Sequence, residues 1–469
     1  MGLTDQPISV SKPTVAIAGA GGYVGRWFIH HFRHKYHIIA LSRKKIKDNP
    51  YPEVTWKQVE LYSISSTVEV LKGVDVAIYL VHSMNASTRL NQGSFEDTDL
   101  LLADNFSRAA HLNKVKQIIY LGGLLPKETG EKLSRHLRSR LEVEETLGSR
   151  SAKLTAIRAS IIVGPGGSSF DMIKNLVKNL PVLMCPQWTE SLTQPISLRD
   201  TLDIIDTCVA NKNVYGQAIE IGNPEVISYR KMLEITAEEM GKKRLVFSVP
   251  VFSLGLSKLW VGLFGESPPQ LVSPLVESLR HTLTVSEELK FREKNIAYLT
   301  YQESVREALD SDIELLEPSF FPQEKVKNTV RSIQRMANPE GNTATWVAQR
   351  YNIWLPTFFK FWINGEMLES GEIVFYFLWS KKNPMLQLTM IPDRSEVNRQ
   401  LFYISGGWLV KRFDHGWLEF RGVLDNKYII TAIHEFVPRL PWLIYVNTQA
   451  RIHLWVMNRF KKYLQNRLN

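Results

Sequence analysis

Three glycines spaced three residues apart, Gly19, Gly22 and Gly25, give the first indication of chemistry in this chain of 469 residues. They follow the apolar run 15–18 and precede a segment, 23–34, whose pattern predicts a helix. Glycines permit a tight turn and close approach of the backbone to a phosphate, and the N–H groups at a helix N-terminus attract anions. Strand, glycine turn and helix in this order predict a dinucleotide-binding turn, with a tight connection that binds nothing as the alternative.

A second polar stretch, Ser42-Arg43-Lys44-Lys45, follows the apolar run 37–41. In dinucleotide-binding sheets the end of this strand faces the adenosine ribose, where an acidic residue favours NAD and a basic residue accommodates a 2′-phosphate. We therefore expect NADP(H) to be preferred, with NAD(H) as the alternative cofactor. A solvated cationic turn is the competing interpretation.

The elements that would position these residues alternate between strands and helices. Apolar runs predict strands at 15–18, 37–41, 54–61, 74–81, 115–121 and 154–160, and helices at about 23–34, 66–72, 97–112 and 131–148. A further strand and turn, predicted at 216–221, is expected in the substrate region rather than in this series. This alternation predicts an α/β fold with a doubly wound parallel sheet, in which ligands bind beyond the carboxyl ends of the strands. Five segments should therefore converge: Gly19–Gly25, Arg43, Leu80–His82, Leu121–Gly123 and Ala159–Ile161.

Longer motifs make the chain resemble a known family. The glycine turn, the strand series and Gln194-Pro-Ile-Ser-Leu-Arg-Asp200 resemble an extended, atypical short-chain dehydrogenase/reductase of the NmrA-like and epimerase-like kind. Four stretches resemble one bacterial branch with a C-terminal domain of unknown function: Tyr79-Leu-Val-His-Ser-Met, Tyr120-Leu-Gly-Gly-Leu, Leu133-Ser-Arg-His-Leu-Arg-Ser-Arg and Leu180-Pro-Val-Leu-Met-Cys-Pro-Gln-Trp. The resemblance implies an NAD(P)-binding Rossmann domain with a small substrate lobe at about residues 165–325.

The chain departs from that family at its usual catalytic pair. The family's chemistry uses a tyrosine acid and a lysine four residues later, a spacing that puts both side chains on one helix face. None of the sixteen tyrosines has a lysine at that spacing, and the matching positions are His136 and Arg140. His136 is therefore a candidate proton donor, a contact to the cofactor ribose or an ordinary half-buried histidine. Arg140 can hold a ribose or phosphate but cannot act as a base.

The resemblance and the strand order together predict the site residues. The predicted catalytic residues are His136 and Arg140, and no metal site is expected. The cofactor contacts are expected from the glycine turn, the strand ends and the helix that carries His136, namely Gly19, Gly21, Gly22, Tyr23, Val24, Gly25, Ser42, Arg43, Leu61, Leu80, Val81, Leu121, Gly122, Gly123 and Arg140.

Composition narrows the class of protein. The chain is 44% hydrophobic and 22% charged, which is a globular composition, and its length favours two domains. The first ten residues lack the apolar core of a secretory signal, and the two cysteines, Cys185 and Cys208, suggest neither disulfides nor metal binding. We therefore expect a cytoplasmic protein. The net charge of +10 is dispersed and no nucleic-acid motif accompanies it, so no nucleic acid is expected as a partner.

The most apolar window, 246–265, is interrupted by Pro250 and Lys258. It predicts a buried helix of the substrate lobe, with peripheral contact to the inner membrane as the alternative. Two polar residues that precede helical patterns, Asp200 and Ser228, are expected to be N-caps.

A second domain is predicted after a polar, proline-bearing segment at about 309–340, which gives domains at 1–325 and 335–469. Apolar runs at 372–379, 385–391, 408–413, 416–421 and 427–436 predict an antiparallel meander, and 446–467 predicts a terminal helix. This order resembles an α+β helix-grip fold of the START/SRPBCC type, which often encloses an apolar cavity.

Two groups of residues in this second domain have alternative interpretations. Its aromatic residues either line a cavity or fill the core: Trp354, Phe358, Phe359, Phe361, Trp362, Phe375, Tyr376, Phe377 and Trp379. Arg394, Arg421 and His434 are expected to form structural ion pairs rather than a catalytic group.

Two functional hypotheses follow. The chain is either an NADP(H)-binding, reductase-like oxidoreductase acting on a hydrophobic small molecule, or a non-catalytic NADP(H)-dependent sensor, assembly factor or lipid-binding scaffold. The missing tyrosine–lysine pair favours the second hypothesis. The expected partners are a nicotinamide dinucleotide and a hydrophobic small molecule or lipid.

Overall fold

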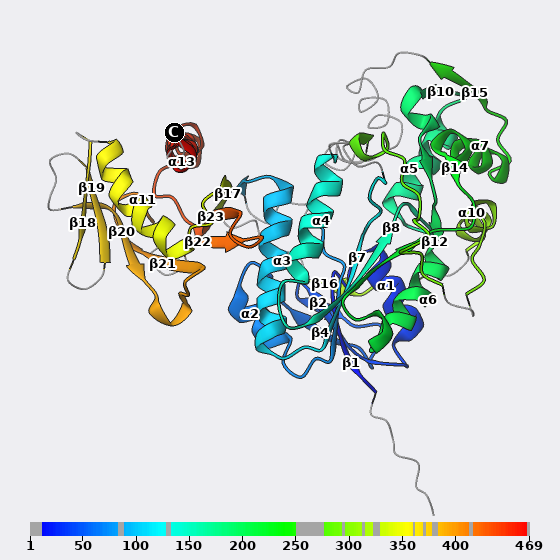
Figure 1. The fold of residues 1–469 in the computed structure, drawn as a ribbon, viewed down its shortest axis with the longest axis horizontal. Coiled ribbons are helices and arrows are strands. Elements are labelled where there is room, and N and C mark those ends of the chain that lie inside the picture. The colour runs from blue at the N-terminus through cyan, green and yellow to red at the C-terminus, as the bar shows by residue number, and fades with distance from the viewer. Residues whose placement is uncertain are drawn as a thin grey trace, which may run out of the picture. The chain divides into compact units, whose positions relative to one another are not determined.

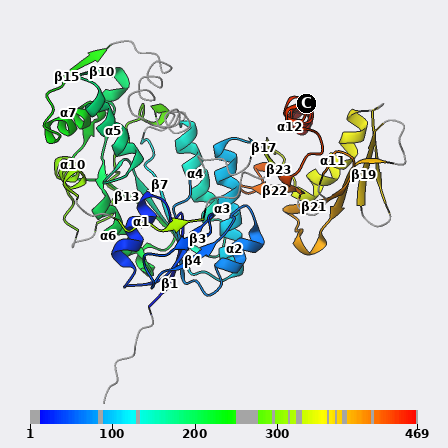
Figure 2. The same cartoon turned by 180° about the vertical axis from the view of Figure 1, so that it is seen from behind.

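The computed structural model describes residues 12–82, 89–127, 133–249, 276–292, 296–311, 315–321, 329–359, 362–368, 372–377, 383–411 and 416–466. The chain divides into two compact units (Figure 1 and Figure 2). The first unit comprises the chain up to His82 together with Leu102–Phe321, and the second comprises Ser83–Leu101 together with Pro322–Asn469. The second unit is therefore discontinuous in sequence.

The first unit contains a seven-stranded parallel sheet, which confirms the predicted doubly wound α/β fold. The strand order is β13 (Gln217–Ile221), β8 (Lys153–Ala159), β7 (Gln117–Gly123), β5 (Val76–Tyr79), β1 (Thr14–Ala18), β2 (His37–Ser42) and β4 (Thr55–Gln58). Apolar runs predicted all seven strands, although β13 was expected in the substrate region rather than in this sheet. Such runs are continuous because helices cover both faces of the sheet, and Val15 to Ala18 are fully buried.

Helices pack on both faces of this sheet. Figure 1 and Figure 2 show α1 (Tyr23–Phe32) and α6 (Leu198–Cys208) on one face, opposite α4 (Arg135–Leu147). The opposite face also carries α2 (Ile64–Val70) and the part of α3 (Phe95–Leu112) that belongs to this unit. The buried side chains of α1 and α6 share one apolar core with the central strands.

Serine side chains begin several of these helices. Ser228 caps α7 (Tyr229–Glu239) as predicted, because its side chain accepts the N–H of Lys231. The expectation that Asp200 is an N-cap is wrong. Ser197 caps α6 instead, its Oγ accepting the N–H of Asp200 at 2.9 Å. Ser197 is three residues earlier, so it reaches the unpaired amide in the first turn, and Asp200 accepts the N–H of Leu299 at 3.0 Å.

The remaining elements of the first unit form the predicted lobe region, residues 165–325. Its helices are α5 (Ser168–Asn179), α7 and α10 (Tyr301–Asp310), with η1 (Gln187–Glu190) and η2 (Lys212–Val214). Short strands accompany them: β9 (Ile162–Val163), β10 (Val182–Pro186), β11 (Leu192–Thr193), β12 (Ile196–Ser197), β14 (Ile227–Ser228) and β15 (Leu245–Val249). Cys185 and Cys208 are buried free thiols.

The described start of the apolar window 246–265 is not a buried helix. It is strand β15, which pairs in parallel with β10, and Phe247 is 48% exposed. The residue before a proline disfavours helical geometry, and Pro250 follows this strand directly. The rest of the predicted helix lies outside the described residues.

The second unit contains an eight-stranded sheet. Its order is β18 (Ile363–Met367), β19 (Glu372–Phe377), β20 (Pro384–Met390), β21 (Arg399–Gly406), β22 (Trp417–Val423), β23 (Tyr428–Phe436), β17 (Val330–Ala337) and β6 (Leu90–Gln92). Neighbours are antiparallel except β17 and β6, which pair in parallel from Leu90 opposite Val330. Apolar runs predicted β19, β20, β22 and β23, whereas β6, β17, β18 and β21 were not predicted.

Two helices cover one face of this sheet. The helices are α11 (Ala344–Phe358) and α13 (Gln449–Gln465), with the short α12 (Trp442–Asn447) before α13. The ring of Tyr351 on α11 lies 5.0 Å from that of Phe460 on α13, so both helices share one core. The predicted terminal helix is therefore confirmed, while the helix-grip assignment stays a prediction.

The strand expected at 408–413 is wrong. Residues 408–411 form a turn with a single bridge between Val410 and Pro438, and residues 412–415 lie outside the described part of the chain. Gly407, just before this turn, has φ of +116°, a conformation that breaks a strand and that only glycine adopts without strain.

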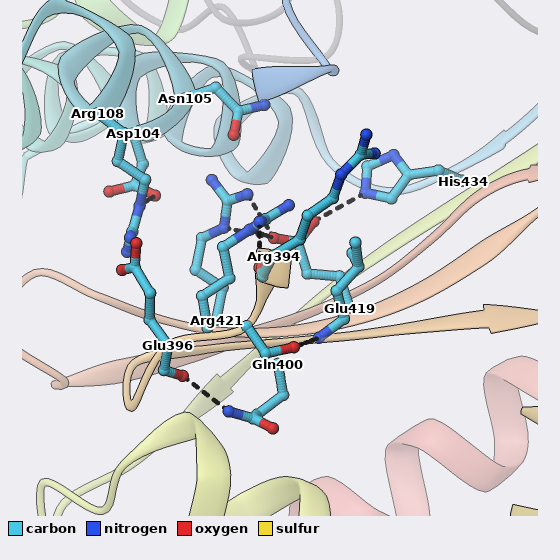
Figure 3. A network of polar contacts seen from close by, with 12 residues as sticks. Asp104, Asn105, Arg108, Arg394, Glu396, Gln400, Glu419, Arg421 and His434 are labelled. Atoms are coloured by element: carbon cyan, nitrogen blue, oxygen red, sulfur yellow. Dashed lines mark hydrogen bonds and ion pairs between the residues drawn. The ribbon is translucent and has the colours of Figure 1, made fainter. Parts of the chain in front are cut away.

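A buried charge cluster joins three strands of this sheet (Figure 3). The Glu419 carboxylate accepts from Arg399 Nε at 2.6 Å and from Arg421 Nε at 2.9 Å, and lies 3.5 Å from His434 Nε2. Burial alone would raise the pKa of Glu419, but the Arg421 and Arg399 charges hold it well below its usual range. Arg421 therefore forms the expected structural ion pair. Burial lowers the pKa of His434 to about 4, so this imidazole is neutral at pH 7 and does not form the expected ion pair. Arg394 contributes its backbone carbonyl, which accepts from Arg399 Nη1 at 2.8 Å.

Candidate dinucleotide site

The glycine turn brings three parts of the chain into close contact. Gly19 has φ of +90°, and a Cβ placed on it would lie 2.9 Å from the Leu80 carbonyl oxygen. A Cβ on Gly25 would lie 2.5 Å from the Gly19 oxygen, so any larger residue would disrupt the turn. Gly21 and Gly22 are exposed. The turn therefore leaves an open backbone surface against the end of β5.

Helix α1 begins at this open surface. Its N-cap is Gly22, which makes no side-chain capping hydrogen bond, and the first turn carries no acidic residue. Tyr23 and Val24, both predicted cofactor contacts, are partly buried in that first turn. The helix N-terminus therefore offers backbone N–H donors and positive potential to an anion, which is the property that a pyrophosphate site needs.

The Tyr23 side chain turns away from the glycine surface. Its ring packs against the loop Gly164–Gly167, where a Cβ on Gly167 would lie 2.9 Å from ring atoms. The Tyr23 hydroxyl is buried and has no hydrogen-bond partner among the described residues. Burial, with a smaller effect of the Asp171 charge, raises the pKa of Tyr23, so this phenol stays protonated.

The end of β2 carries the residues expected to read the ribose. Arg43 is exposed, whereas the Ser42 hydroxyl accepts the N–H of Lys44 at 3.1 Å and shapes the turn. Gln58 Nε2 donates to the Arg43 carbonyl at 3.1 Å and so fixes the backbone there. The structure thus leaves the Arg43 guanidinium free to meet an anion in solution.

A segment that sequence reasoning missed covers the same edge. Strand β3 (Ile46–Asp48) pairs with β16 (Ser319–Phe320) in antiparallel fashion, and we call residues 315–321 the strap. Phe320 lies edge-on to Trp56 with ring centroids 5.7 Å apart, and its ring is the nearest atom group to a Cβ placed on Gly21, at 3.9 Å. Glu317 forms an ion pair with Arg26 on α1. Only the pairing of 319–320 with 46–48 reveals this placement, and no local pattern signals it.

Helix α4 lies over the end of β7. The nearest atoms to a Cβ placed on Gly123 would be Leu137 Cδ2 at 3.6 Å and Arg140 Cγ at 3.9 Å. A Cβ on Gly122 would lie 2.9 Å from the ring of Tyr120, and the Tyr120 hydroxyl donates to the Arg140 carbonyl at 3.3 Å. The structure therefore brings Gly122, Gly123 and Arg140 together, as predicted.

His136 lies in the first turn of α4, which Ser134 caps. Its ring centroid is 5.3 Å from that of His82, which follows β5, and its Nδ1 is buried without a hydrogen-bond partner among the described residues. Burial, then the charges of Arg140 and His82, lower the pKa of His136 well below its usual value. The imidazole is therefore neutral near pH 7.

An ion-pair network holds α4 against the sheet. Arg158 on β8 donates to the Glu144 carboxylate on α4 at 2.7 Å and 3.0 Å, and lies 3.6 Å from Glu220 on β13. Glu220 in turn accepts the N–H and hydroxyl of Ser286 at 2.8 Å and 2.9 Å. Because both carboxylates are partly or fully buried, this network fixes the position of the helix that carries His136.

Leu61 and the ends of β5 and β7 are the remaining predicted contacts. Leu61 is buried, and its carbonyl accepts Asn105 Nδ2 at 2.8 Å. Leu80 and Val81 are partly buried at the end of β5, beside Gly19, and Leu121 is partly buried at the end of β7. The strand ends thus converge at one edge of the sheet as expected.

Among the residues that the structure describes, no cluster of three or more His, Cys, Asp or Glu side chains could hold a metal ion. No helix in that part of the chain is both long and apolar enough to cross a membrane.

The parallel sheet, the glycine turn at α1 and the convergent strand ends define a dinucleotide-binding domain of the Rossmann class. Comparison with known families agrees. Residues 15–136 match the NAD dependent epimerase/dehydratase family. The N-terminal part of the chain therefore has a Rossmann-like fold and is similar to NAD dependent epimerases and dehydratases.

Individual relatives cover parts of the chain. It is 32% identical over 130 residues to the auxiliary protein GraX of Staphylococcus aureus, a match that spans 27% of this chain and 41% of that protein. It is 22% identical over 282 residues to the chloroplastic divinyl chlorophyllide a 8-vinyl-reductase of Zea mays, covering 55% of this chain and 68% of that protein.

A solved structure shares the fold of the first unit. The crystal structure of a nucleoside-diphosphate-sugar epimerase from Staphylococcus aureus superposes with a TM-score of 0.50 at 16% identity. The match covers 63% of this chain and 99% of that structure.

Proposed function

We propose that the first unit binds NADP(H) and acts as a reductase on a hydrophobic small molecule. The observation that carries this proposal is the glycine turn, where exposed backbone at the N-terminus of α1 faces the ends of β5 and β2. A bound nicotinamide cofactor would supply hydride chemistry there. The chain's own contribution is to bind the phosphates with the amides of α1 and to orient the cofactor with α4.

Arg43 supports the preference for NADP(H) over NAD(H). Its guanidinium is exposed at the end of β2 and could pair with a 2′-phosphate, whose two negative charges suit the planar fork of donors. Ser42, whose hydroxyl already accepts a backbone N–H, would contribute to the turn rather than to the phosphate.

His136 would act as a neutral group. Its unpartnered buried Nδ1 is suited to a hydrogen bond with a ribose hydroxyl or a substrate carbonyl. Because its pKa is lowered, little imidazolium is present near pH 7 to serve as an acid, so the ribose contact is favoured over proton donation. Arg140 would hold a phosphate or ribose from the same helix.

Titration of the full chain with NADPH and with NADH tests this proposal. Tryptophan fluorescence would follow binding, and loss of NADPH absorbance would follow turnover with a panel of hydrophobic enones, quinones and carbonyls. Tight NADPH binding with oxidation by at least one compound is the expected result. Failure of both nucleotides to bind would overturn the proposal.

A second candidate function is a non-catalytic NADP(H)-dependent sensor. Two observations favour it. The tyrosine–lysine pair is missing. The strap pairs with β3 at the edge of the proposed adenosine site, and the chain continues from the strap directly into the second unit. The similarity to an auxiliary protein over 130 residues is consistent with it. Tight NADPH binding without oxidation across the panel would select this function.

For the domain organisation and location of the protein, we infer a Rossmann domain with a substrate lobe up to about residue 325, a helix-grip domain from about residue 335, and a cytoplasmic location. The order of an antiparallel sheet followed by a terminal helix supports the helix-grip assignment.

A further inference from the structure

The second unit encloses a cavity of about 520 Å³ between its sheet and the helices α11, α12 and α13. This volume lies within the range of small-molecule sites in proteins, about 300–1,000 Å³. Of the aromatic residues predicted to line such a cavity, Phe359, Trp362, Phe375 and Phe377 do so. Trp354 and Phe358 instead stack on each other in the core, and Phe361 and Trp379 lie outside the described residues.

The cavity opens through apolar side chains. Trp362 is 57% exposed and Phe377 is 41% exposed, and their ring centroids lie 6.0 Å apart. Both residues also line the cavity, as does Ile452 on α13, which is 55% exposed. Large apolar side chains that remain in water at the mouth of a cavity favour entry of an apolar molecule rather than an ion.

The cavity has one polar end, formed by β6 and the start of α13. Gln92 Nε2 donates to the Ala450 carbonyl at 3.1 Å, so the oxygen Oε1 of the same amide points away from that carbonyl. That oxygen and Gln449 Oε1 are both buried without a hydrogen-bond partner among the described residues. Two unpaired acceptors at one end of an apolar cavity cost free energy unless a ligand donates to them.

The lining carries no permanent charge. Among the described residues that line the cavity, none is Asp, Glu, Lys or Arg. The one titratable base there is His453, one helical turn after Gln449, and burial lowers its pKa to about 4. An ionised ligand would therefore enter without a counter-charge, which is strongly unfavourable.

We propose that this cavity binds a neutral apolar molecule that carries a hydroxyl group, with the hydroxyl donating to Gln449 Oε1. The apolar body of the ligand fills the space between Phe375, Leu388 and Tyr351. This site is independent of the dinucleotide site, because every lining residue belongs to the second unit.

The test compares matched ligands on the full chain without nucleotide. The probes are 1-decanol, decanoate and decyl methyl ether, measured at pH 7.5 by native mass spectrometry and by the fluorescence of Trp362 and Trp408, which line the cavity. We expect 1-decanol to bind at least tenfold more tightly than decanoate, and at least fivefold more tightly than the ether, which cannot donate.

Two variants locate the site. Gln449→Leu should bring the affinities for decanol and ether within twofold of each other, while Asn458→Leu, an exposed change on the same helix, should leave the preference intact. Leu386→Trp should fill the cavity and abolish binding of both ligands. Thermal unfolding and an NADPH titration, both expected to stay as in the wild type for Gln449→Leu, show that the chain is folded.

Three results would overturn the proposal. These are decanoate binding as tightly as decanol, an unchanged preference for decanol in Gln449→Leu, and a lack of saturable binding for both 1-decanol and the ring-shaped alcohol menthol. None of them depends on whether NADPH binds, so this proposal and the proposed reductase function can fail separately.

Discussion

His82 and His136 approach each other from two different elements, with ring centroids 5.3 Å apart and planes inclined by 57°. One ring follows β5 and the other lies in the first turn of α4, beyond the carboxyl ends of the strands. Two neighbouring imidazoles disfavour protonation of each other, which adds to the effect of burial on His136. His136 therefore presents a neutral imidazole to whatever binds above Gly122 and Gly123.

The first prediction concerns the role of His136. In a reductase assay, kcat should show no ionisation attributable to His136 between pH 6 and 8, because its pKa lies well below 6.5. Because the neutral imidazole is proposed to contact the cofactor ribose, His136→Gln should weaken NADPH binding several-fold and lower kcat by less than the roughly 10²-fold expected for loss of a general acid. His111→Gln, an exposed histidine on α3, is the control. A loss of kcat of roughly 10²-fold or more with an unchanged Kd for NADPH would instead assign proton transfer to His136.

The second prediction concerns cofactor choice. Arg43→Glu should weaken NADPH binding at least tenfold more than NADH binding, because the 2′-phosphate would meet a carboxylate in place of a guanidinium. Lys47→Glu makes the same charge change at a neighbouring exposed position and should affect both nucleotides little. Fluorescence titration measures the Kd values of both nucleotides. Equal losses of affinity for NADPH and NADH would show that Arg43 does not contact the 2′-phosphate.

The third prediction concerns the packing of the glycine turn. Gly25→Ala should destabilise the first unit by roughly 1–3 kcal/mol, because the new Cβ would lie 2.5 Å from the Gly19 oxygen and 2.9 Å from Ala20 Cα. Gly21→Ala is the matched control, since the nearest atom to its Cβ is 3.9 Å away. Denaturant unfolding measures both variants, and equal stabilities would contradict the close packing of this turn.

The fourth prediction concerns the strap. Glu317 pairs with Arg26 at the N-terminal end of α1, so Glu317→Gln should remove a negative charge beside the proposed phosphate site. The affinity for NADPH should rise a few-fold, and the gain should shrink in high salt because both side chains reach solvent. Glu238→Gln, an exposed change on α7, controls for net charge. A weaker affinity for NADPH would mean that the ion pair supports the site instead.

The fifth prediction concerns the stability of the second unit in acid. His453 has a pKa of about 4 when folded and about 6.5 when unfolded, so the unfolded chain binds more protons between these values. Stability is therefore lost as the pH falls from about 6.5 toward 4, by an amount on the order of 2–3 kcal/mol. In urea unfolding, the stability of His453→Leu should fall less steeply between pH 6.5 and 4 than that of the wild type. An unchanged pH dependence of stability would show that His453 does not have a lowered pKa in the folded chain.

The parallel sheet was predictable because its signals are local. Apolar runs mark strands that are buried on both faces, and the glycine turn marks the first crossover. The spacing of His136 and Arg140 also places both on one helix, which the structure bears out in α4. Strand pairing over long separations leaves no such local trace.

Several of the elements that were missed depend on distant partners. Leu90 pairs with Val330 across 240 residues, and Phe320 pairs with Ile46 across 274 residues. Strand β17 lies in a polar, proline-bearing segment that was expected to be a linker, and its buried face became visible only with its partner β23. The proximity of His82 to His136 likewise required the fold, since the two residues are 54 positions apart in sequence.

Strand β6 comes from an early part of the chain, so a single cut between the two units cannot separate a complete second unit. A protein cut near residue 325 would leave its C-terminal piece without Leu90–Gln92, so β17 would become an open sheet edge and the cavity would lose Gln92 from its polar end. An unprotected edge strand invites pairing with other molecules. The C-terminal piece expressed alone would thus aggregate, or would fold without binding its ligand. A chimaera that also contains residues 83–101 would keep both the protected sheet edge and the polar end of the cavity.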